Sequence, residues 1–440
     1  MDLESLKQIS QDVLKLVKNA GASSAECDVS FGTGQSVSVR KGETENIEYN
    51  RDKGVSVTVY FGQQKGNASS SDLSAQALKD TVQAACDIAK FTAKDEFCGL
   101  ADASLMAKNI PDLDLYYAWN VGVEEALEIA KRCEAAALNV DKKRITNSEG
   151  ASVSTSEGVF AYANSHGFVG GYPSSRHSIS CSVIAGDGDT MQRDYWYSSA
   201  RDSSDLESAE FIGKTAGERT IRRLGARPMK TGQYPVLFEA NLASSIVSSL
   251  ISAISGGNLY RKSSFLLDSL GKQIGASLLN IEELPHIKKG IASSAFDDEG
   301  VATHSRKVVE NGVLNGYVMG SYSARKLGLQ STGNAGGSHN LIVQNTHKAA
   351  DLLQTMGTGL LVTEVLGHGL NMVTGDYSRG AAGFWVENGV IAHPVEEITI
   401  ASNMKDMLNQ IIAIGDDAIK HSSKQVGSIL VESMTVAASQ

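Results

Sequence analysis

The spacing of apolar side chains near the amino terminus changes from a helical to a strand period. Residues 3–20 place their apolar side chains on one stripe that ends at Gly21, which predicts an opening amphipathic helix. From residue 25 to residue 70 apolar positions alternate with polar ones, and glycine-containing turns separate the alternating runs. This change of period predicts that an antiparallel meander follows the helix.

Two more helical patterns and a second group of strands come next. The helical patterns cover residues 73–91 and 121–138, and the strand patterns cover residues 151–184. Residues 206–224 predict another helix, and the Gly- and Pro-containing stretch 225–232 after it predicts a linker. The first half of the chain is therefore expected to combine helices with an antiparallel sheet.

The second half of the chain has mainly strand patterns. Residues 233–238 predict a strand, and residues 240–254 predict a helix that ends before a Gly-Gly pair. Beyond residue 290 short strands dominate, and the Asn-Gly pairs within 310–312 and 387–389 indicate hairpins. We expect few helices in this half, placed at its edges.

Together these patterns predict an α+β fold with two domains. A chain of 440 residues exceeds what one hydrophobic core usually organises. We assign residues 1–205 to a helix-plus-antiparallel-sheet domain and residues 206–232 to a helix and linker. Residues 233–440 are assigned to a β-rich carboxyl-terminal domain.

Charge and targeting signals narrow the function classes. A formal net charge of −10 works against nonspecific binding to nucleic acid, because that binding depends on Lys and Arg neutralising phosphates. The densest basic stretch, Arg219–Lys230, is interleaved with apolar residues, and we interpret it as a solvated helix face and the loop after it. The sequence shows neither a secretory signal nor 18 uninterrupted apolar residues. We expect a cytoplasmic protein with no nucleic-acid or membrane partner.

The sequence lacks a complete set of catalytic residues for a zinc hydrolase. A zinc hydrolase needs about three protein ligands and a Glu, but no two of the nine histidines have the spacing of a local helical pair. Two segments, Phe238–Ala243 and Thr363–His368, resemble His-Glu-x-x-x-His and keep Glu in second place. The first has Phe and Ala at the ligand positions, and the second has Thr and one His. Neither segment predicts a metal site.

Three other chemical signatures are also incomplete. The glycine-rich string Gly333–Ser338 lacks the order of a phosphate-binding loop, so we interpret it as an ordinary loop. The acidic string Asp297–Glu299 does not extend to a calcium-binding loop and is interpreted as an exposed acidic turn. A Gly-x-Ser-x-Gly motif is missing from the sequence, so a serine hydrolase is unsupported.

Four strings in the second half carry a resemblance to a known family. They are Phe296–Gly300, Glu310–Leu314, Ser331–Asn334 and the long block Thr374–Gly389. Taken together they resemble the PmbA/TldE branch of the TldD/PmbA metallopeptidase family. The likeness extends over nearly the whole chain, from the opening helix to the segment Pro394–Ile400.

The resemblance implies that this chain lacks the family's metal ligands. TldD-like members carry His-Glu-x-x-x-His and a late Cys, whereas here Phe238 and Ala243 stand in place of the two histidines. Residues 421–427, where the late Cys is expected, contain none. The resemblance therefore implies no metal, cofactor or catalytic residue in this chain, and zinc in a TldD-like partner. Glu239, which persists at the position of the general base, is expected to be a capping or interface carboxylate.

The family resemblance also implies a substrate and a partner. It suggests a subunit that forms a heterodimer with a TldD-like chain and acts on unfolded peptides, and it allows a homodimer when the chain is alone. The residues expected to contribute to a peptide or partner groove are Gly333, Asn334, His368, Asp376 and Arg379.

Two alternatives stay open at this point. One is an autonomous metallopeptidase whose site assembles from distant residues such as His339, Glu364 and His368. The other is a non-catalytic binding or regulatory protein, in line with the family's older description as a modulator of DNA gyrase.

Overall fold

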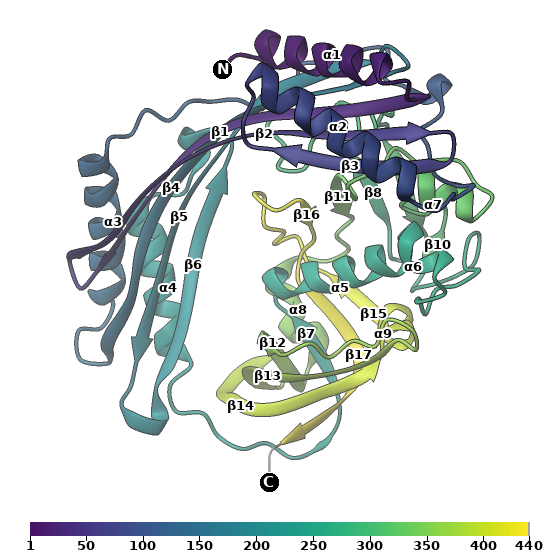
Figure 1. The fold of residues 1–440 in the computed structure, drawn as a ribbon. Helices are drawn as coiled ribbons and strands as arrows, with labels where there is room; N and C mark the ends of the chain where they lie inside the picture. Colours follow the sequence, from purple (N-terminus) through teal and green to yellow (C-terminus); the bar gives the residue numbers. More distant parts are fainter. Residues whose placement is uncertain (439–440) are drawn as a thin grey trace.

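A computed structural model describes residues 1–438, so the last two residues of the predicted carboxyl-terminal domain lie outside it. The amino-terminal half is organised around a six-stranded antiparallel sheet with the order β3-β2-β1-β4-β5-β6 (Figure 1). Its strands are β1 (Ser24–Arg40), β2 (Glu43–Phe61), β3 (Gln64–Ser70), β4 (Ile145–Asn164), β5 (Val169–Ala185) and β6 (Gln192–Ala200). The meander predicted for residues 25–70 is confirmed as β1–β3, whereas the sequence patterns missed β6 after the turn at Gly186.

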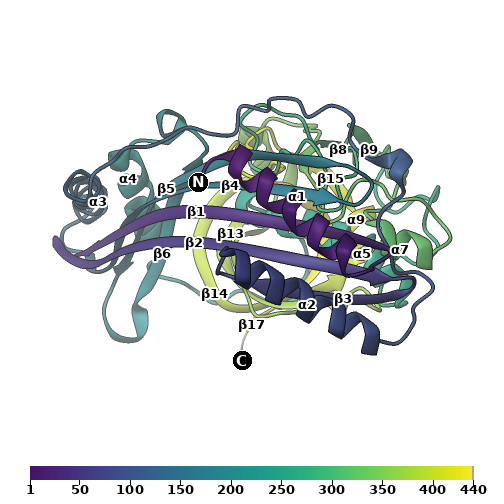
Figure 2. The same ribbon diagram turned by 45° about the horizontal axis from the view of Figure 1, so that its top comes forward.

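Four helices cover one face of this sheet. They are α1 (Leu3–Asn19), α2 (Ala75–Phe91), α3 (Val123–Leu138) and α4 (Ala209–Arg222). On β1, Val29 packs in the core under α1 and α2, and Val37 packs in the core under α3 and α4. Because side chains alternate along a strand, the even-numbered residues of β1 face the other way, toward the carboxyl-terminal half. Figure 2 shows α1 and α2 lying across the outer face of the strands.

The carboxyl-terminal half contains two further sheets. The larger has the order β14-β13-β12-β7-β17-β15, and an additional β14–β17 pairing closes five of its strands into a ring. Its strands are β7 (Gly232–Phe238), β12 (Gly359–Leu366), β13 (Asp376–Glu387), β14 (Val390–Asn403), β15 (Ile411–Ile414) and β17 (Ile429–Ala438). The smaller has the order β10-β9-β8-β11-β16. Its strands are β8 (Ile281–Leu284), β9 (Arg306–Glu310), β10 (Val313–Leu314), β11 (Asn340–Val343) and β16 (Lys424–Gln425).

Helix α5 (Ala240–Ala253) lies inside the carboxyl-terminal half rather than at its edge. It contacts β7 and β12 of the larger sheet and β16 of the smaller one. Ile246, Val247 and Leu250 are almost fully buried in the core that both sheets share. The expectation of helices only at the edges is therefore wrong for α5, whose apolar stripe packs in the core shared by the two sheets. The shorter helices are α6 (Gly256–Tyr260), α7 (Ser321–Lys326), α8 (Leu352–Met356) and α9 (Met404–Asn409).

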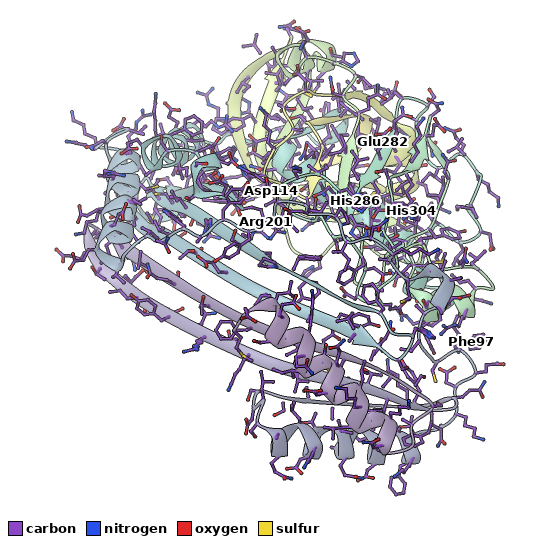
Figure 3. The ribbon with its side chains drawn as sticks, turned by 90° about the horizontal axis from the view of Figure 1, so that it is seen from above. Phe97, Asp114, Arg201, Glu282, His286 and His304 are labelled. Atoms are coloured by element: carbon purple, nitrogen blue, oxygen red, sulfur yellow. The ribbon has the colours of Figure 1, made fainter. Side chains whose placement is uncertain are left out.

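The two halves are held together by aromatic packing and by arginines that bind backbone carbonyls. The ring centroid of Phe296 lies 5.1 Å from that of Phe168 and 5.7 Å from that of Tyr172. Phe168 directly precedes β5, and Tyr172 lies on it. Arg201, which follows β6, donates to the carbonyl of Ile291 at 2.8 Å (Figure 3). The α+β class is thus confirmed, with a helix-plus-antiparallel-sheet first part and a strand-rich second part. Within residues 1–438, no helix has the length and apolar character needed to cross a membrane.

Candidate functional site

The segment Phe238–Ala243 lies where β7 ends and α5 begins. Phe238 is 1% exposed and pairs with Val362 of β12 and Ile429 of β17. Ala243 is fully buried on the first turn of α5. Apolar side chains packed in the core therefore occupy both positions at which the resemblance implies histidines.

Residues 421–427, where the resemblance implies a late Cys as third ligand, contain no Cys and end at a tightly packed glycine. A Cβ added to Gly427 would lie 1.9 Å from the carbonyl oxygen of Gly415, so a side chain there requires the backbone to move. Over residues 1–438, no group of three or more His, Cys, Asp or Glu side chains is placed to hold a metal ion. The residues at the degenerate motif do not fit a catalytic zinc, which needs about three ligands from the protein.

Glu239 joins α5 to α4. Its carboxylate accepts hydrogen bonds from Nη1 and Nη2 of Arg219 at 2.8 and 2.9 Å, and one from Arg222 at 3.3 Å. It makes no capping hydrogen bond to α5, although it occupies the N-cap position. A bidentate arginine fixes the direction of this carboxylate, which suits an interface role better than proton transfer.

The ion pairs continue from Arg219 toward β6 and β12. Nε of Arg219 donates to Asp194 at 3.2 Å, and Arg223 contacts both Asp194 and Glu364. Burial lowers the pKa of the Arg219 guanidinium, but the hydrogen-bonded carboxylates of Glu239 and Asp194 have the larger effect and raise it overall. We name these residues, with Arg222, the interdomain ion network: Asp194, Arg219, Arg222, Arg223, Glu239 and Glu364.

This network corrects the interpretation of Arg219–Lys230 as a solvated helix face. Arg219 is only 8% exposed, and its guanidinium packs over the ring of Trp196 at 5.3 Å. The helical spacing carried the signal, because Ile212, Ala216 and Arg219 lie on the same buried face of α4. The identity of the partners was not visible in the sequence, since Asp194 and Glu239 come from other elements.

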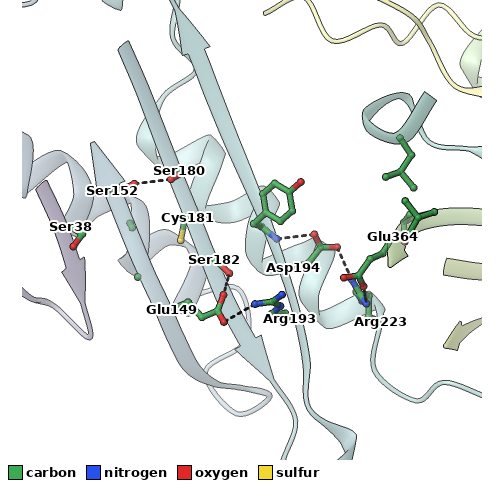
Figure 4. Close-up of a pocket in the computed structure, with 16 residues that line it drawn as sticks. Ser38, Glu149, Ser152, Ser180, Cys181, Ser182, Arg193, Asp194, Arg223 and Glu364 are labelled. Carbon is green, nitrogen blue, oxygen red and sulfur yellow. Dashed lines mark hydrogen bonds and ion pairs between the residues drawn. The ribbon is translucent and has the colours of Figure 1, made fainter. Parts of the chain in front are cut away.

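A cavity of about 600 Å³ lies beside the network, between the first sheet and the carboxyl-terminal half (Figure 4). Leu242 of α5 and the segment Thr363–Val365 of β12 form one wall, so both degenerate segments contribute to it. The opposite wall is the inner face of the first sheet, where Ser152 and Ser180 are hydrogen-bonded at 2.8 Å. The lining offers polar donors and acceptors along strands, among them the hydroxyl of Ser182, which donates to the carboxylate of Glu149 at 2.7 Å.

The five residues expected in a groove do not form one site. His368 and Arg379 share a second cavity of about 190 Å³ with Tyr377, a residue that the sequence patterns did not single out. Asp376 is exposed, on the opposite face of β13, and accepts hydrogen bonds from Thr374 and Asn403.

Gly333 and Asn334 lie in a separate loop. Asn334 lines a third cavity and is 4% exposed. Its amide donates to Glu283 at 2.7 Å, and its carbonyl oxygen accepts from Arg306 at 2.9 Å. Gly333 has a φ of +72°, and its carbonyl contacts His339 at 2.9 Å. These contacts stabilise the loop. Of the five predicted groove residues, only His368 and Arg379 line the same cavity.

The acidic string Asp297–Glu299 is an exposed turn only in part: Asp298 is exposed in a turn, whereas Asp297 is buried, which corrects the sequence interpretation for that residue. Asp297 is 2% exposed and accepts backbone hydrogen bonds from Glu299, Val301 and Ala335. Burial raises the pKa of Asp297 to about 7, and the backbone N–H groups oppose this shift. Phe296, next to it, anchors the contact between the two halves and thereby places the carboxylate in the interior.

Comparison with known proteins places the chain in a family. Residues 25–89, 116–224 and 231–438 match the first, central and carboxyl-terminal domains of the PmbA/TldA metallopeptidase models. The first sheet combines strands from the first two of these matches.

Two curated relatives are similar over most of their length. The metalloprotease PmbA homolog of Haemophilus influenzae is 49% identical over 98% of this chain and 96% of its own. The metalloprotease PmbA of Escherichia coli O157:H7 is 51% identical over 94% of this chain and 92% of its own.

Solved structures support the same assignment. A protein of Bacteroides thetaiotaomicron, described as a candidate modulator of DNA gyrase, superimposes with a TM-score of 0.93 at 30% identity, over 98% of this chain and 99% of its own. TldE of Thermococcus kodakarensis has a TM-score of 0.82 at 19% identity, over 97% of this chain and 99% of its own, and shows the shared fold alone. The chain belongs to the PmbA branch of the PmbA/TldD metallopeptidase family.

Proposed function

We propose that this chain is the non-catalytic subunit of a cytoplasmic metallopeptidase that processes or degrades unfolded peptides. In this proposal a TldD-like partner supplies zinc and the catalytic Glu, and the present chain forms a heterodimer with it. One observation carries the proposal: the buried Phe238 and Ala243 stand at the ligand positions implied by the family resemblance.

The contacts of Glu239 also support a non-catalytic role for this chain. A general base must be free to accept a proton from a metal-bound water. Here the Glu239 carboxylate is bound by Arg219 on two atoms and by Arg222 on one. The residue that survives from the motif serves to join α4 to α5 in this chain.

The cavity beside the network suggests what the subunit contributes. An extended peptide is held through main-chain hydrogen bonds, and specificity comes from pockets for its side chains. The lining of Ser152, Ser180 and Ser182 offers small polar groups along neighbouring strands, and Leu242 adds an apolar contact. We propose that this wall holds part of the substrate while the partner cleaves it, which lowers the entropic cost of the reaction.

Reconstitution tests the proposal. The chain alone, the TldD-like partner alone and their mixture are each assayed with an unfolded peptide, with and without a chelator. We expect full activity only in the mixture, and we expect the chelator to abolish it. Chelator-resistant activity of the lone chain would contradict the proposal.

Metal analysis addresses the autonomous alternative. If this chain had a non-standard site built around His368 and His339, it would bind zinc stoichiometrically when alone, and His368→Ala would lose that zinc. We expect no stoichiometric zinc in either protein. The regulatory alternative predicts instead that the chain binds DNA gyrase without any TldD-like subunit, which a pull-down with purified proteins measures.

A further inference from the structure

The cavity shared by His368 and Arg379 contains a cation without a counter-charge. Arg379 is half-buried, and it forms no ion pair within residues 1–438, where its Nη2 donates only to the carbonyl of Gly367. Its buried Nε and the hydroxyl of Tyr377, a residue that is 4% exposed, make no well-formed hydrogen bond. The guanidinium and the phenol are neighbours, because Arg379 opposes the rise that burial causes in the pKa of Tyr377. Buried polar groups are normally hydrogen-bonded, so two such atoms in one small cavity point to an absent ligand.

The chemistry of the lining selects an anion. Arg379 presents a planar fork of N–H donors, which matches the geometry of a carboxylate. His368 and the phenol of Tyr377 supply further donors. Ser245 and Ser249 already donate to carbonyls of α5 at 2.6 and 2.9 Å, so the donors for an anion come from Arg379, His368 and Tyr377 and not from these hydroxyls.

The nearby carboxylate of β13, that of Asp376, does not pair with Arg379 in the cavity. Asp376 lies on the opposite face of β13 from Tyr377 and Arg379, because successive side chains alternate. Its oxygens accept hydrogen bonds from Thr374 and Asn403. In a chain of net charge −10, an unpaired arginine in a cavity is therefore a specific arrangement rather than part of a balanced surface.

The loop 367–370 closes one end of the cavity. Gly369 packs directly on β13, where an added Cβ would lie 1.8 Å from the Ser378 carbonyl oxygen and 2.5 Å from Cγ of Arg379. The Ser378 N–H donates to the Gly369 carbonyl at 2.7 Å, which pins the loop. A polypeptide therefore cannot pass between this loop and β13, so the cavity is closed to a bound chain on that side.

The cavity that contains Arg379 and the larger cavity beside the interdomain ion network lie along the same helix, α5. Leu242 lines the larger cavity and Ser245 and Ser249 line the smaller one, on the same helix. From Leu242 to Ser249 the helix rises about 10 Å, which equals about three residues of an extended peptide. A volume of about 190 Å³ is sufficient for one terminal residue, since a cavity of about 150 Å³ holds benzene.

We infer that Arg379, with His368 and Tyr377, binds the carboxyl-terminal carboxylate of a peptide whose preceding residues extend toward the larger cavity. The inference rests on the proposed function and deepens it, because it defines one end of the substrate and its direction. The site is a binding site and takes no part in bond cleavage.

Three versions of one short fluorescent peptide test the inference. The first has a free carboxyl terminus, the second has a terminal amide, and the third is the amide with a Glu near its end. Fluorescence anisotropy measures their affinity for the chain alone and for its complex with the TldD-like partner. We expect the free carboxylate to bind at least about tenfold more tightly than either amide, because one charge-assisted, bidentate contact is lost in each.

Matched variants assign the effect to the cavity. Arg379→Gln should bind all three peptides with the affinity of the amide, and Arg379→Lys should retain part of the preference. Arg132→Gln, at an exposed arginine paired with Glu210, should behave like the unmodified chain. Thermal unfolding of each variant shows that the fold is intact.

The outcomes separate this inference from the proposed function. Equal affinity for free acid and amide, or a preference that persists in Arg379→Gln, overturns the inference and leaves peptide binding in place. Equal affinity for the free acid and the Glu-containing amide overturns the assignment to the chain terminus. If no peptide binds the chain or its complex, both the inference and the proposed function fail.

Discussion

Arg219 donates two hydrogen bonds to Glu239, at 2.8 and 2.9 Å, and this contact joins α4 on the first sheet to the start of α5 in the second half. The same guanidinium binds Asp194 of β6 at 3.2 Å. One arginine thus connects three elements from both halves of the chain. Glu239, the one residue of the segment Phe238–Ala243 that matches the family motif, is thus a structural contact between the two halves of this chain.

Arg219→Met should destabilise the protein by about 2–5 kcal/mol, because it leaves the buried carboxylate of Asp194 and the partly buried carboxylate of Glu239 without their main partner. Chemical denaturation measures the change in the free energy of unfolding. The control Arg132→Met removes an ion pair whose side chains are 60% and 59% exposed, and should cost less than about 1 kcal/mol. Equal effects of the two substitutions would show that the interdomain ion network contributes no more than a surface pair.

Restoring the two histidines should not restore a metal site. In the double variant Phe238→His and Ala243→His, a polar ring replaces a fully buried Phe, and a large ring replaces an Ala with no free space. We expect a loss of stability of about 3 kcal/mol or more and no stoichiometric zinc, since a third ligand is lacking. Unfolding and metal analysis measure the two effects. Tight zinc binding by the double variant would show that this region still holds a ligand set.

The sequence predicted the parts of the fold that depend on local periodicity. Alternating residues identified β1–β3, and the helical pattern identified α4, but Arg219 was interpreted as solvated although it lies with Ile212 on the buried face of that helix. The chemistry of that face depends on contacts between distant segments. Arg379 and Ser249 come together only when the loop after β12 folds back on β13 beside α5, and no local pattern specifies that arrangement.

The sequence did not predict the surroundings of Asp297 and Tyr377, because these too depend on contacts between distant segments. Asp297 belongs to a short acidic string, which alone indicates an exposed turn. It is buried because the neighbouring Phe296 packs against rings of the first sheet. Tyr377 belongs to a strand pattern, and only the tertiary structure shows that its hydroxyl makes no well-formed hydrogen bond. Spacing along the chain predicts which face is buried but not which charges meet there.

Stability should fall as the pH rises from about 4 to 7, and Asp297 should contribute to the fall. Burial raises the pKa of Asp297 from 3.8 to about 7, so the folded protein binds more protons than the unfolded chain in this window. The contribution is present below pH 3.8 to its full extent and is lost progressively as the pH approaches 7. Thermal unfolding at a series of pH values measures the slope.

Asp297→Asn tests this assignment, because Asn remains neutral and still accepts the hydrogen bonds from Glu299 and Val301 through its oxygen. We expect the variant to be less stable at low pH but to lose less stability between pH 4 and 7 than the unmodified chain. Asp80→Asn, at an exposed residue of α2, should leave the slope unchanged. A slope equal to that of the unmodified chain in Asp297→Asn would assign the pH dependence to other groups.

A bulky residue on the inner face of the first sheet should block substrate without unfolding the protein. Ser180 lines the larger cavity and bonds Ser152 across the β4–β5 pair. Ser180→Phe fills part of this space, so peptide processing by the reconstituted complex should fall by at least about tenfold, because productive positioning of the peptide is lost.

The matched control is Ser69→Phe, at an exposed serine of the edge strand β3, which lines none of the cavities described above. Initial rates at several peptide concentrations show whether KM rises, as expected for lost binding, or whether kcat alone falls. Ser69→Phe should change neither. If Ser180→Phe processed peptide as the unmodified complex does, the substrate would follow another path, and the serine-lined wall would only help to shape the space between the two halves.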